Sequence, residues 1–209
     1  MIAIIDYGMG NLRSVQKALE KIGSSATICR KPEELADADA AILPGVGAFR
    51  DAIGELDRLG FSDAIRRHVG EQRPLLGICL GLQLLFDISE EDGEHAGLGL
   101  VPGRVVRFES QPGLKIPHMG WNTIEPTSQA AALPQLSGVD AGSHVYFVHS
   151  YHVVPDDRSV VALESDHGGR FVAAIQSGSI FATQFHPEKS QAVGQRLLRN
   201  FVESVAVGV

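Results

Sequence analysis

The sequence is poor in cysteine, with only Cys29 and Cys79 among its 209 residues. Two cysteines cannot form the several bridges of a small secreted scaffold, so a disulfide framework is excluded. The first residues, MIAIID, read as a β-strand and carry no basic leader of the kind that opens a signal peptide. We therefore expect a cytoplasmic protein in which both thiols are free.

Positive charge is also scarce in this sequence. Lysine and arginine number 18 against 25 aspartate and glutamate residues, which gives a formal net charge of -7. A protein that binds nucleic acid or an anionic membrane surface needs a basic face, so neither partner is expected. No hydrophobic run approaches the roughly 18 apolar residues that cross a bilayer. The apolar content of 44% nevertheless suffices for a sizeable core.

Short apolar runs alternate with helical patterns in the first half of the chain, as is typical of a parallel sheet with helices on both faces. From residue 98 to about 147, strand-like stretches broken by glycine and proline predict an antiparallel extension. The prediction is one α/β domain over residues 1–209, a three-layer, open, mostly parallel sheet with that extension. Strands are predicted at 2–5, 26–29, 40–43, 75–78, 105–108, 145–148, 160–163, 172–175 and 180–185, and helices at 11–22, 61–68, 81–86 and 190–205.

Four unusual segments lie where predicted strands end. Because ligands bind at the carboxyl ends of the strands in open parallel sheets, we expect these segments to meet around one site. They are 7–11 (YGMGN), 44–47 (PGVG), 79–81 (CLG) and 186–188 (HPE).

Cys79 lies between two glycines, in the sequence GICLG, after a predicted buried strand and before a predicted helix. This is the layout of a nucleophile elbow, a tight strand-to-helix turn that exposes its central side chain. A thiol at a helix N-terminus is favoured as thiolate, the reactive form. The alternative is that Cys79 is a small buried hydrophobic residue, as most free cysteines are.

His186 and Glu188 follow the last predicted strand and should therefore reach the same sheet edge as Cys79. A cysteine nucleophile needs one group that accepts its proton and protonates the leaving group, and an imidazole can do both. The carboxylate of Glu188 can then bond the second ring nitrogen and fix the tautomer. The three residues together predict a catalytic triad, although a lone His-Pro-Glu is more often a turn.

Acyl transfer also requires N–H donors for the developing oxyanion. The backbone N–H of Leu80, directly after the nucleophile, is one natural donor. The turn at Val46 and Gly47 could supply the second, because its glycines let the chain aim an N–H at a ligand. The simpler interpretation of this turn is the ordinary end of a strand.

These motifs, GICLG, a later HPE and a PGVG turn after the third strand, resemble the class I glutamine amidotransferases over the whole chain. The resemblance implies a flavodoxin-like fold and a Cys-His-Glu triad that releases ammonia from glutamine, with no cofactor. It also implies that Gln83 and Gly47 contact the substrate glutamine, and that the backbone at Ser150 and Tyr151 binds its amino-acid end.

Four longer segments are similar to a narrower group within this family, the glutaminase subunits that serve histidine biosynthesis. That similarity implies a heterodimer in which the partner is a (β/α)8-barrel cyclase that uses the ammonia. The segments are 6–15 (DYGMGNLRSV), 117–122 (PHMGWN), 146–152 (YFVHSYH) and 186–190 (HPEKS).

Three residues are candidates for the contact with such a partner. Asn11 ends the loop after the first strand, Lys189 directly follows the predicted triad carboxylate, and Trp121 is the only tryptophan. Tryptophan is favoured at interface hot spots because it buries a large rigid surface. For Trp121 the alternative is a core position in the antiparallel extension.

No metal site is predicted from the eight histidines. His149 and His152 are the closest pair, but on an extended segment they should point to opposite faces, and no cysteine or carboxylate completes a tetrahedral site. Three other functions stay open at this point: a stand-alone cysteine peptidase or γ-glutamyl hydrolase, the glutaminase of another pathway such as that of anthranilate, and a non-catalytic binding module.

Overall fold

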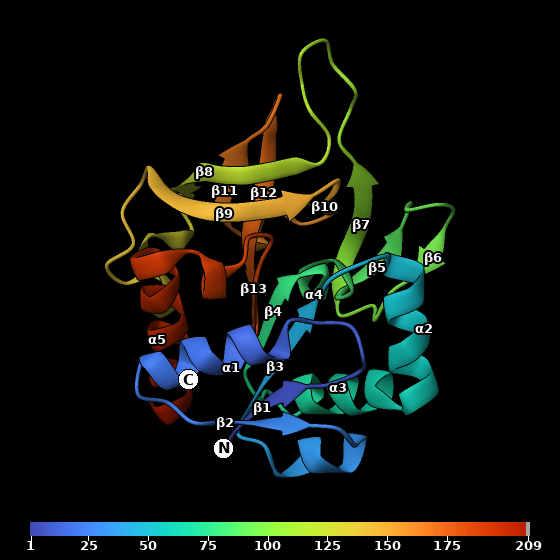
Figure 1. Ribbon diagram of the computed structural model, residues 1–209, viewed down its shortest axis with the longest axis vertical. Coiled ribbons are helices and arrows are strands. Elements are labelled where there is room, and N and C mark those ends of the chain that lie inside the picture. The colour runs from blue at the N-terminus through green and yellow to red at the C-terminus, as the bar shows by residue number, and fades with distance from the viewer. Residues whose placement is uncertain (208–209) are drawn as a thin grey trace.

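The computed structural model describes residues 1–207 (Figure 1). Its strands are β1 (Ile2–Ile5), β2 (Ala26–Cys29), β3 (Ala40–Gly45), β4 (Leu75–Cys79), β5 (Phe86–Ser89), β6 (His95–Ala96), β7 (Val101–Arg107), β8 (His118–Pro126), β9 (Ser143–His149), β10 (Tyr151–Pro155), β11 (Val161–Asp166), β12 (Arg170–Ser177) and β13 (Ile180–Thr183). Its α-helices are α1 (Leu12–Lys21), α2 (Phe49–Leu59), α3 (Phe61–Gly70), α4 (Leu80–Gln83) and α5 (Gln191–Val207). Short 3-10 helices include η5 (Pro187–Lys189).

The main sheet has nine strands in the order β2-β1-β3-β4-β13-β12-β11-β8-β9. The first five are parallel neighbours, and from β13 to β9 every pair is antiparallel. This arrangement confirms the predicted α/β class, with a parallel region that continues into an antiparallel extension. In Figure 1 the extension forms the upper part of the molecule, where β8 and β9 run side by side.

Helices cover both faces of the parallel region because side chains alternate along each strand. Ile2 and Ile4 of β1 belong to a core shared with Val15 and Leu19 of α1 and Phe201 of α5. The residues between them on β1 face a second core that contains the apolar stripes of α2 and α3. Its members include Ala3, Ile5, Phe49, Ile53, Leu56, Phe61 and Ile65.

Helix α2 was not predicted from the sequence, although its apolar residues recur at helical spacing. The predicted helix at 81–86 was wrong in extent, since α4 ends after a single turn at Gln83. Beyond it, the backbone N–H of Leu98 donates to the carbonyl of Leu84 at 2.8 Å. The returning chain thus occupies a carbonyl group that a longer helix would have bonded to its own backbone N–H, and β5 begins at Phe86.

A second sheet of four strands, in the order β10-β7-β5-β6, was not expected. Its strand β10 follows β9 after a single residue, Ser150, so the chain passes from one sheet to the other at that point. None of the helices within residues 1–207 is long and apolar enough to cross a membrane.

Candidate active site

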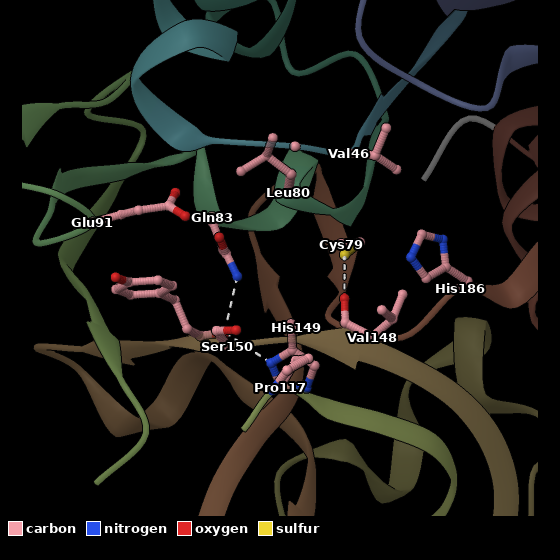
Figure 2. A pocket seen from close by; sticks show the side chains of 12 residues that line it. Val46, Cys79, Leu80, Gln83, Glu91, Pro117, Val148, His149, Ser150 and His186 are labelled. Atoms are coloured by element: carbon pink, nitrogen blue, oxygen red, sulfur yellow. Dashed lines mark hydrogen bonds between the residues drawn. The ribbon is translucent and has the colours of Figure 1, made fainter. Parts of the chain in front are cut away.

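A cavity of about 270 Å³ lies at the carboxyl ends of β3 and β4 (Figure 2). Three of the four segments predicted to meet at this sheet edge, 44–47, 79–81 and 186–188, contribute lining residues, whereas the segment 7–11 contributes none of the described residues that line it. The residues that line it are Val46, Gly47, Cys79, Leu80, Gln83, Glu91, Pro117, Val148, His149, Ser150, Tyr151 and His186.

Cys79 ends β4 with a backbone that non-glycine residues rarely adopt, φ 56° and ψ -109°. Such strain persists only where the surrounding structure enforces it, and it is the geometry of a nucleophile elbow. The flanking glycines permit the turn. A Cβ on Gly81 would lie 1.9 Å from the carbonyl oxygen of Leu43 in β3, and one on Gly77 would lie 2.9 Å from the Cβ of Ala182. Helix α4 has only four residues, so its dipole adds less than a full helix would.

The sulfur of Cys79 lies between two polar groups. It is 3.8 Å from the carbonyl oxygen of Val148, to which the thiol can donate, and 3.9 Å from the side-chain Nε2 of Gln184. Gln184 is completely buried and precedes His186 by two residues. We did not single it out from the sequence, although a glutamine inside an apolar strand pattern was a usable signal.

His186 and Glu188 form a buried pair beside Cys79. The Nδ1 of His186 lies 2.8 Å from Oε1 of Glu188, and both side chains are almost fully buried. Burial by itself lowers the pKa of His186, but the thiol of Cys79 and the carboxylate of Glu188 raise this pKa more, so the net shift is upward. The other ring nitrogen, Nε2, is buried without a partner, and Figure 2 shows the ring next to the cysteine.

Hydrogen bonds of Ser190 and close packing of helix α5 hold the His-Pro-Glu turn in place. The hydroxyl of Ser190 donates to the carbonyl of His186 at 2.7 Å and accepts the backbone N–H of Tyr146 at 3.0 Å. Helix α5 packs so closely that a Cβ on Gly194 would lie 1.8 Å from the carbonyl oxygen of Pro187. These contacts fix the position from which His186 faces the pocket.

The turn after β3 lies on the side of Cys79 away from His186, because β3 and β13 flank β4 on its two sides. Gly45 pairs in register with Cys79, and a Cβ on it would come within 2.9 Å of the Leu80 Cβ. Val46 is 41% exposed at the mouth of the pocket, and Gly47 has a φ of +98° that favours glycine. Val46, Gly47 and Leu80 therefore border the same cavity, although the direction of their N–H groups toward a ligand stays a prediction.

Gln83 has both of its amide hydrogens bound within the protein. Its Nε2 donates to the carbonyl oxygen of Tyr151 at 3.0 Å and to Oε1 of Gln184 at 3.1 Å. The carbonyl of Tyr151 can only accept, so the Gln83 atom that faces it must be the nitrogen. The carbonyl oxygen of Gln83 is then the part of this side chain that a ligand can use.

Glu91 is a lining residue that the sequence analysis missed. It comes from the turn between β5 and β6, and its Oε2 accepts the backbone N–H of Phe49 at the start of α2, at 2.6 Å. Nothing in the sequence distinguishes it from the neighbouring acidic residues Glu90 and Glu94. Ser150 and Tyr151, which were predicted, line the same cavity.

The three candidate contact residues are all exposed, but they lie in different places. Trp121 is 47% exposed and packs edge-to-face on Tyr146 across the β8–β9 pair, at 6.1 Å between ring centroids. The Nζ of Lys189 lies 5.8 Å from the centroid of the same tyrosine ring. Asn11 precedes α1 in a loop that touches the end of β3, since a Cβ on Gly10 would lie 3.2 Å from Pro44 Cγ.

The expectation that His149 and His152 point to opposite faces was wrong. Both rings pack on Phe108, at centroid distances of 5.2 Å and 4.7 Å. The reason is the change of sheet at Ser150, which breaks the alternation of an extended strand. Within residues 1–207 no group of three or more His, Cys, Asp or Glu side chains is placed to hold a metal ion.

Comparisons with known proteins agree with this architecture. The family described as "Glutamine amidotransferase class-I" matches residues 3–205. A protein of Syntrophotalea carbinolica named "Imidazole glycerol phosphate synthase subunit HisH" is 58% identical, with 96% of this chain and 98% of the relative covered. Relatives of the same name from Geobacter sulfurreducens and Aquifex aeolicus are 51% and 50% identical, covering 97% and 95% of this chain and 98% and 94% of theirs.

Solved structures share the fold at lower identity. A crystal structure described as glutamine amidotransferase superposes with a TM-score of 0.75 at 23% identity, covering 99% of this chain and 100% of its own. The glutaminase domain of Trypanosoma brucei CTPS with bound acivicin has a TM-score of 0.70 at 18% identity and covers 99% and 93%. With its family match over residues 3–205 and relatives more than half identical along nearly all of its length, the chain belongs to the class I glutamine amidotransferases.

Proposed function

We propose that this chain hydrolyses glutamine through a triad of Cys79, His186 and Glu188 and delivers the ammonia to a cyclase partner in histidine biosynthesis. The observation that carries the proposal is the strained cysteine elbow, which shares one cavity with a histidine that a buried glutamate orients. The name shared by the relatives, imidazole glycerol phosphate synthase subunit HisH, supports this pathway over that of anthranilate.

The first step is attack of the Cys79 sulfur on the side-chain carbonyl carbon of glutamine. The thiol proton passes to Nε2 of His186, and the raised pKa of this imidazole favours its protonated form. Negative charge then develops on the former carbonyl oxygen. The N–H of Leu80 and those of the turn at Val46 and Gly47 are the donors that we propose for it.

Collapse of this intermediate breaks the carbon–nitrogen bond. Nε2 of His186 returns its proton to the departing nitrogen, so ammonia leaves and a thioester remains on Cys79. Nε2 then takes a proton from water, whose oxygen attacks the thioester carbon. The carbon–sulfur bond breaks to release glutamate, and Nε2 returns the proton to the sulfur of Cys79. Glu188 accepts Nδ1–H of His186 throughout and stabilises the imidazolium.

Recognition of the amino-acid end of glutamine fits the far side of the cavity. The carbonyl oxygen of Gln83 and the carboxylate of Glu91 are acceptors suited to an ammonium group. The backbone of Ser150 and Tyr151 borders the same region and is proposed to bind the α-carboxylate end. Gly47 leaves room for the substrate at the cavity mouth, since it has no side chain.

The partner that we propose is a (β/α)8-barrel cyclase, bound as a heterodimer over the edge where the strands of the parallel region end. Exposed side chains around this edge, including Asn11, Trp121 and Lys189, are the proposed contacts. Ammonia is protonated readily in bulk water and is then no longer a nucleophile, so a docked partner would protect it. We also propose that residues 1–209 act as one domain and that the complex is cytoplasmic.

Two cysteine variants test this proposal. Cys79→Ala should abolish product formation from glutamine by the complex with its cyclase, but leave synthesis from an ammonium salt intact, because the cyclase site is untouched. Cys29→Ala is the matched control, since the thiol of Cys29 is buried and donates to the carbonyl of Lys31 at 3.2 Å, far from the cavity. Equal loss with both nitrogen sources in Cys79→Ala would contradict the division of labour.

A further inference from the structure

Two histidines that the proposed reaction does not use lie at the substrate pocket: His149 lines it, and His118 bonds His149. His118 of β8 and His149 of β9 are paired in register, and both are buried, at 5% and 6% exposure. Their rings sit among aromatic side chains, with His149 at 5.6 Å from Phe147 and His118 stacked at 4.7 Å from the same ring. Buried imidazoles in such surroundings require specific hydrogen-bond partners.

The hydrogen bonds of this pair form a chain with one direction. Nδ1 of His149 lies 2.8 Å from the carbonyl oxygen of Tyr151, which only accepts, so His149 carries its proton on Nδ1. Its Nε2 is then an acceptor, and it faces Nδ1 of His118 at 3.1 Å. His118 must therefore also carry its proton on Nδ1.

The other end of the chain leads to the same assignment independently. The side-chain nitrogen of Asn122 donates to the carbonyl of Asp166 at 2.7 Å, which fixes the orientation of that amide. The same nitrogen lies 3.2 Å from Nε2 of His118, so this ring atom is an acceptor and the proton is on Nδ1. Both ends thus select a single tautomer for each histidine.

Burial keeps this arrangement neutral. It lowers the pKa of His149 to about 3 and that of His118 to about 4, with other histidines nearby adding to the effect. Neither ring gains a second proton near neutral pH, so the hydrogen-bond direction does not change in the range where the enzyme works.

The acceptor of this chain is shared with the substrate pocket. The carbonyl oxygen of Tyr151 receives Nδ1–H of His149 and also the amide of Gln83. Gln83 continues to Gln184, whose nitrogen faces the sulfur of Cys79. Figure 2 shows His149 among the side chains that line the pocket, below Gln83 in this view.

The hydrogen bond from His149 to the Tyr151 carbonyl spans the point where the chain passes from one sheet to the other. The ring belongs to β9 in the main sheet, whereas the carbonyl belongs to β10 in the second sheet, and only Ser150 separates them. The bond therefore ties the two sheets at the segment 148–151, all four residues of which line the cavity.

We propose that His149, held in one tautomer by His118, is a positioning residue that fixes the Tyr151 carbonyl and through it the glutamine-binding face of Gln83. This inference rests on the proposed glutaminase function. It assigns to His149 an effect mainly on substrate binding, because the ring bonds His118 and Tyr151 and is linked to Cys79 only indirectly, through Gln83 and Gln184.

The tautomers are tested on the unmodified protein. Two-bond proton–nitrogen spectra of the imidazoles should show His149 and His118 neutral and protonated on Nδ1 at about pH 7. A proton on Nε2 of His149 would overturn the proposal, because that ring could not donate to the Tyr151 carbonyl.

The positioning role is tested by kinetics of the complex with its cyclase. His149→Phe keeps the ring but removes the donor, and KM for glutamine should rise roughly tenfold, as expected when a buried carbonyl loses one donor, with kcat nearly unchanged. His149→Asn should recover most of the affinity, since its amide nitrogen can occupy the place of Nδ1. His152→Phe is the matched control, because His152 packs on the same Phe108 ring without bonding Tyr151.

The outcomes separate this inference from the function on which it rests. Two results with an active parent would overturn the positioning role alone. One is an unchanged KM for glutamine in His149→Phe, and the other is a KM that rises as much in His152→Phe as in His149→Phe. A fall in kcat with an unchanged KM in a destabilised variant indicates a purely structural role and also overturns it. A parent that releases no ammonia from glutamine, with or without the cyclase, overturns both.

Discussion

The side chains around Cys79 divide the work between reactivity and position. His186 and Glu188 are the residues proposed for proton transfer, whereas Gln184 and the Val148 carbonyl contact the sulfur from either side. The second cysteine shows the contrast, because burial and the nearby Glu34 raise the pKa of Cys29 to about 11. Cys29 and the proposed nucleophile Cys79 thus differ in the groups that surround their sulfur atoms.

Glu188→Gln should reduce glutamine hydrolysis less than His186→Ala does, mainly through kcat. The carboxylate raises the pKa of His186, so its removal lowers that pKa, and the imidazolium is lost at a lower pH. The alkaline limb of the kcat profile should therefore move to lower pH in Glu188→Gln. A profile and rate equal to those of the parent would remove Glu188 from the triad.

At the residue scale, the sequence allowed us to predict the cavity residues that follow or end a strand. Cys79 ends β4 and His186 follows the neighbouring parallel strand β13, which ends at Thr183, so both lie at one sheet edge. Glu91 reaches the cavity from a turn in the second sheet, which local patterns did not reveal. The shared carbonyl of Tyr151 is a backbone group, which every residue has, so its hydrogen bonds could not be predicted from the residue type.

The elbow between β4 and α4 depends on a close approach to β3. Gly81→Ala should lower the free energy of unfolding by about 2 kcal/mol or more, because its Cβ would overlap the carbonyl oxygen of Leu43, which the strand cannot move easily. Gly54→Ala in α2 is the control, since nothing lies within 4 Å of a Cβ there. It should instead stabilise by about 0.5–1 kcal/mol. Urea unfolding of both variants measures the difference, and a Gly81→Ala midpoint equal to that of the parent would refute the close approach.

At the element scale, the parallel strands β1, β3, β4 and β13 were predictable because each is a short apolar run that is buried throughout. The edge strand β2 is only partly buried. The four-stranded sheet was not predictable, since two of its strands are only half-buried and one has two residues. The length of α4 was also missed. Apolar residues at 84–86 continue the helical pattern, but tertiary hydrogen bonds end the helix first.

The surface beside the cavity carries three exposed apolar side chains. Met119 and Trp121, on one face of β8, are 63% and 47% exposed, and Val46 is 41% exposed. Val148, the cross-strand partner of Met119, lines the cavity itself. A partner that docks on this surface would close the cavity from solvent.

Trp121→Ala should weaken binding of the cyclase by about 2 kcal/mol, or roughly thirtyfold in Kd, if the indole is an anchor of the interface. Calorimetry or surface plasmon resonance measures the change, and circular dichroism confirms that the variant is folded. Val154→Ala is the control, because Val154 is 38% exposed on β10 and does not line the cavity. Unchanged affinity in Trp121→Ala would place the partner elsewhere.

Burial of His149 as a neutral ring also makes unfolding of the whole molecule a proton-uptake reaction. The unfolded chain binds a proton at the ordinary pKa of 6.5, whereas the folded chain resists protonation down to about pH 3. Above pH 6.5 this histidine leaves stability unaffected, and as the pH falls below it the unfolded state gains. By about pH 5 the loss amounts to about 2 kcal/mol. His149→Phe should remove this share of the acid sensitivity in urea titrations, and His144→Gln, at an exposed histidine, should not. The share of His118, whose pKa burial lowers to about 4, should remain, so that the buried histidine pair limits how acidic an environment the fold tolerates.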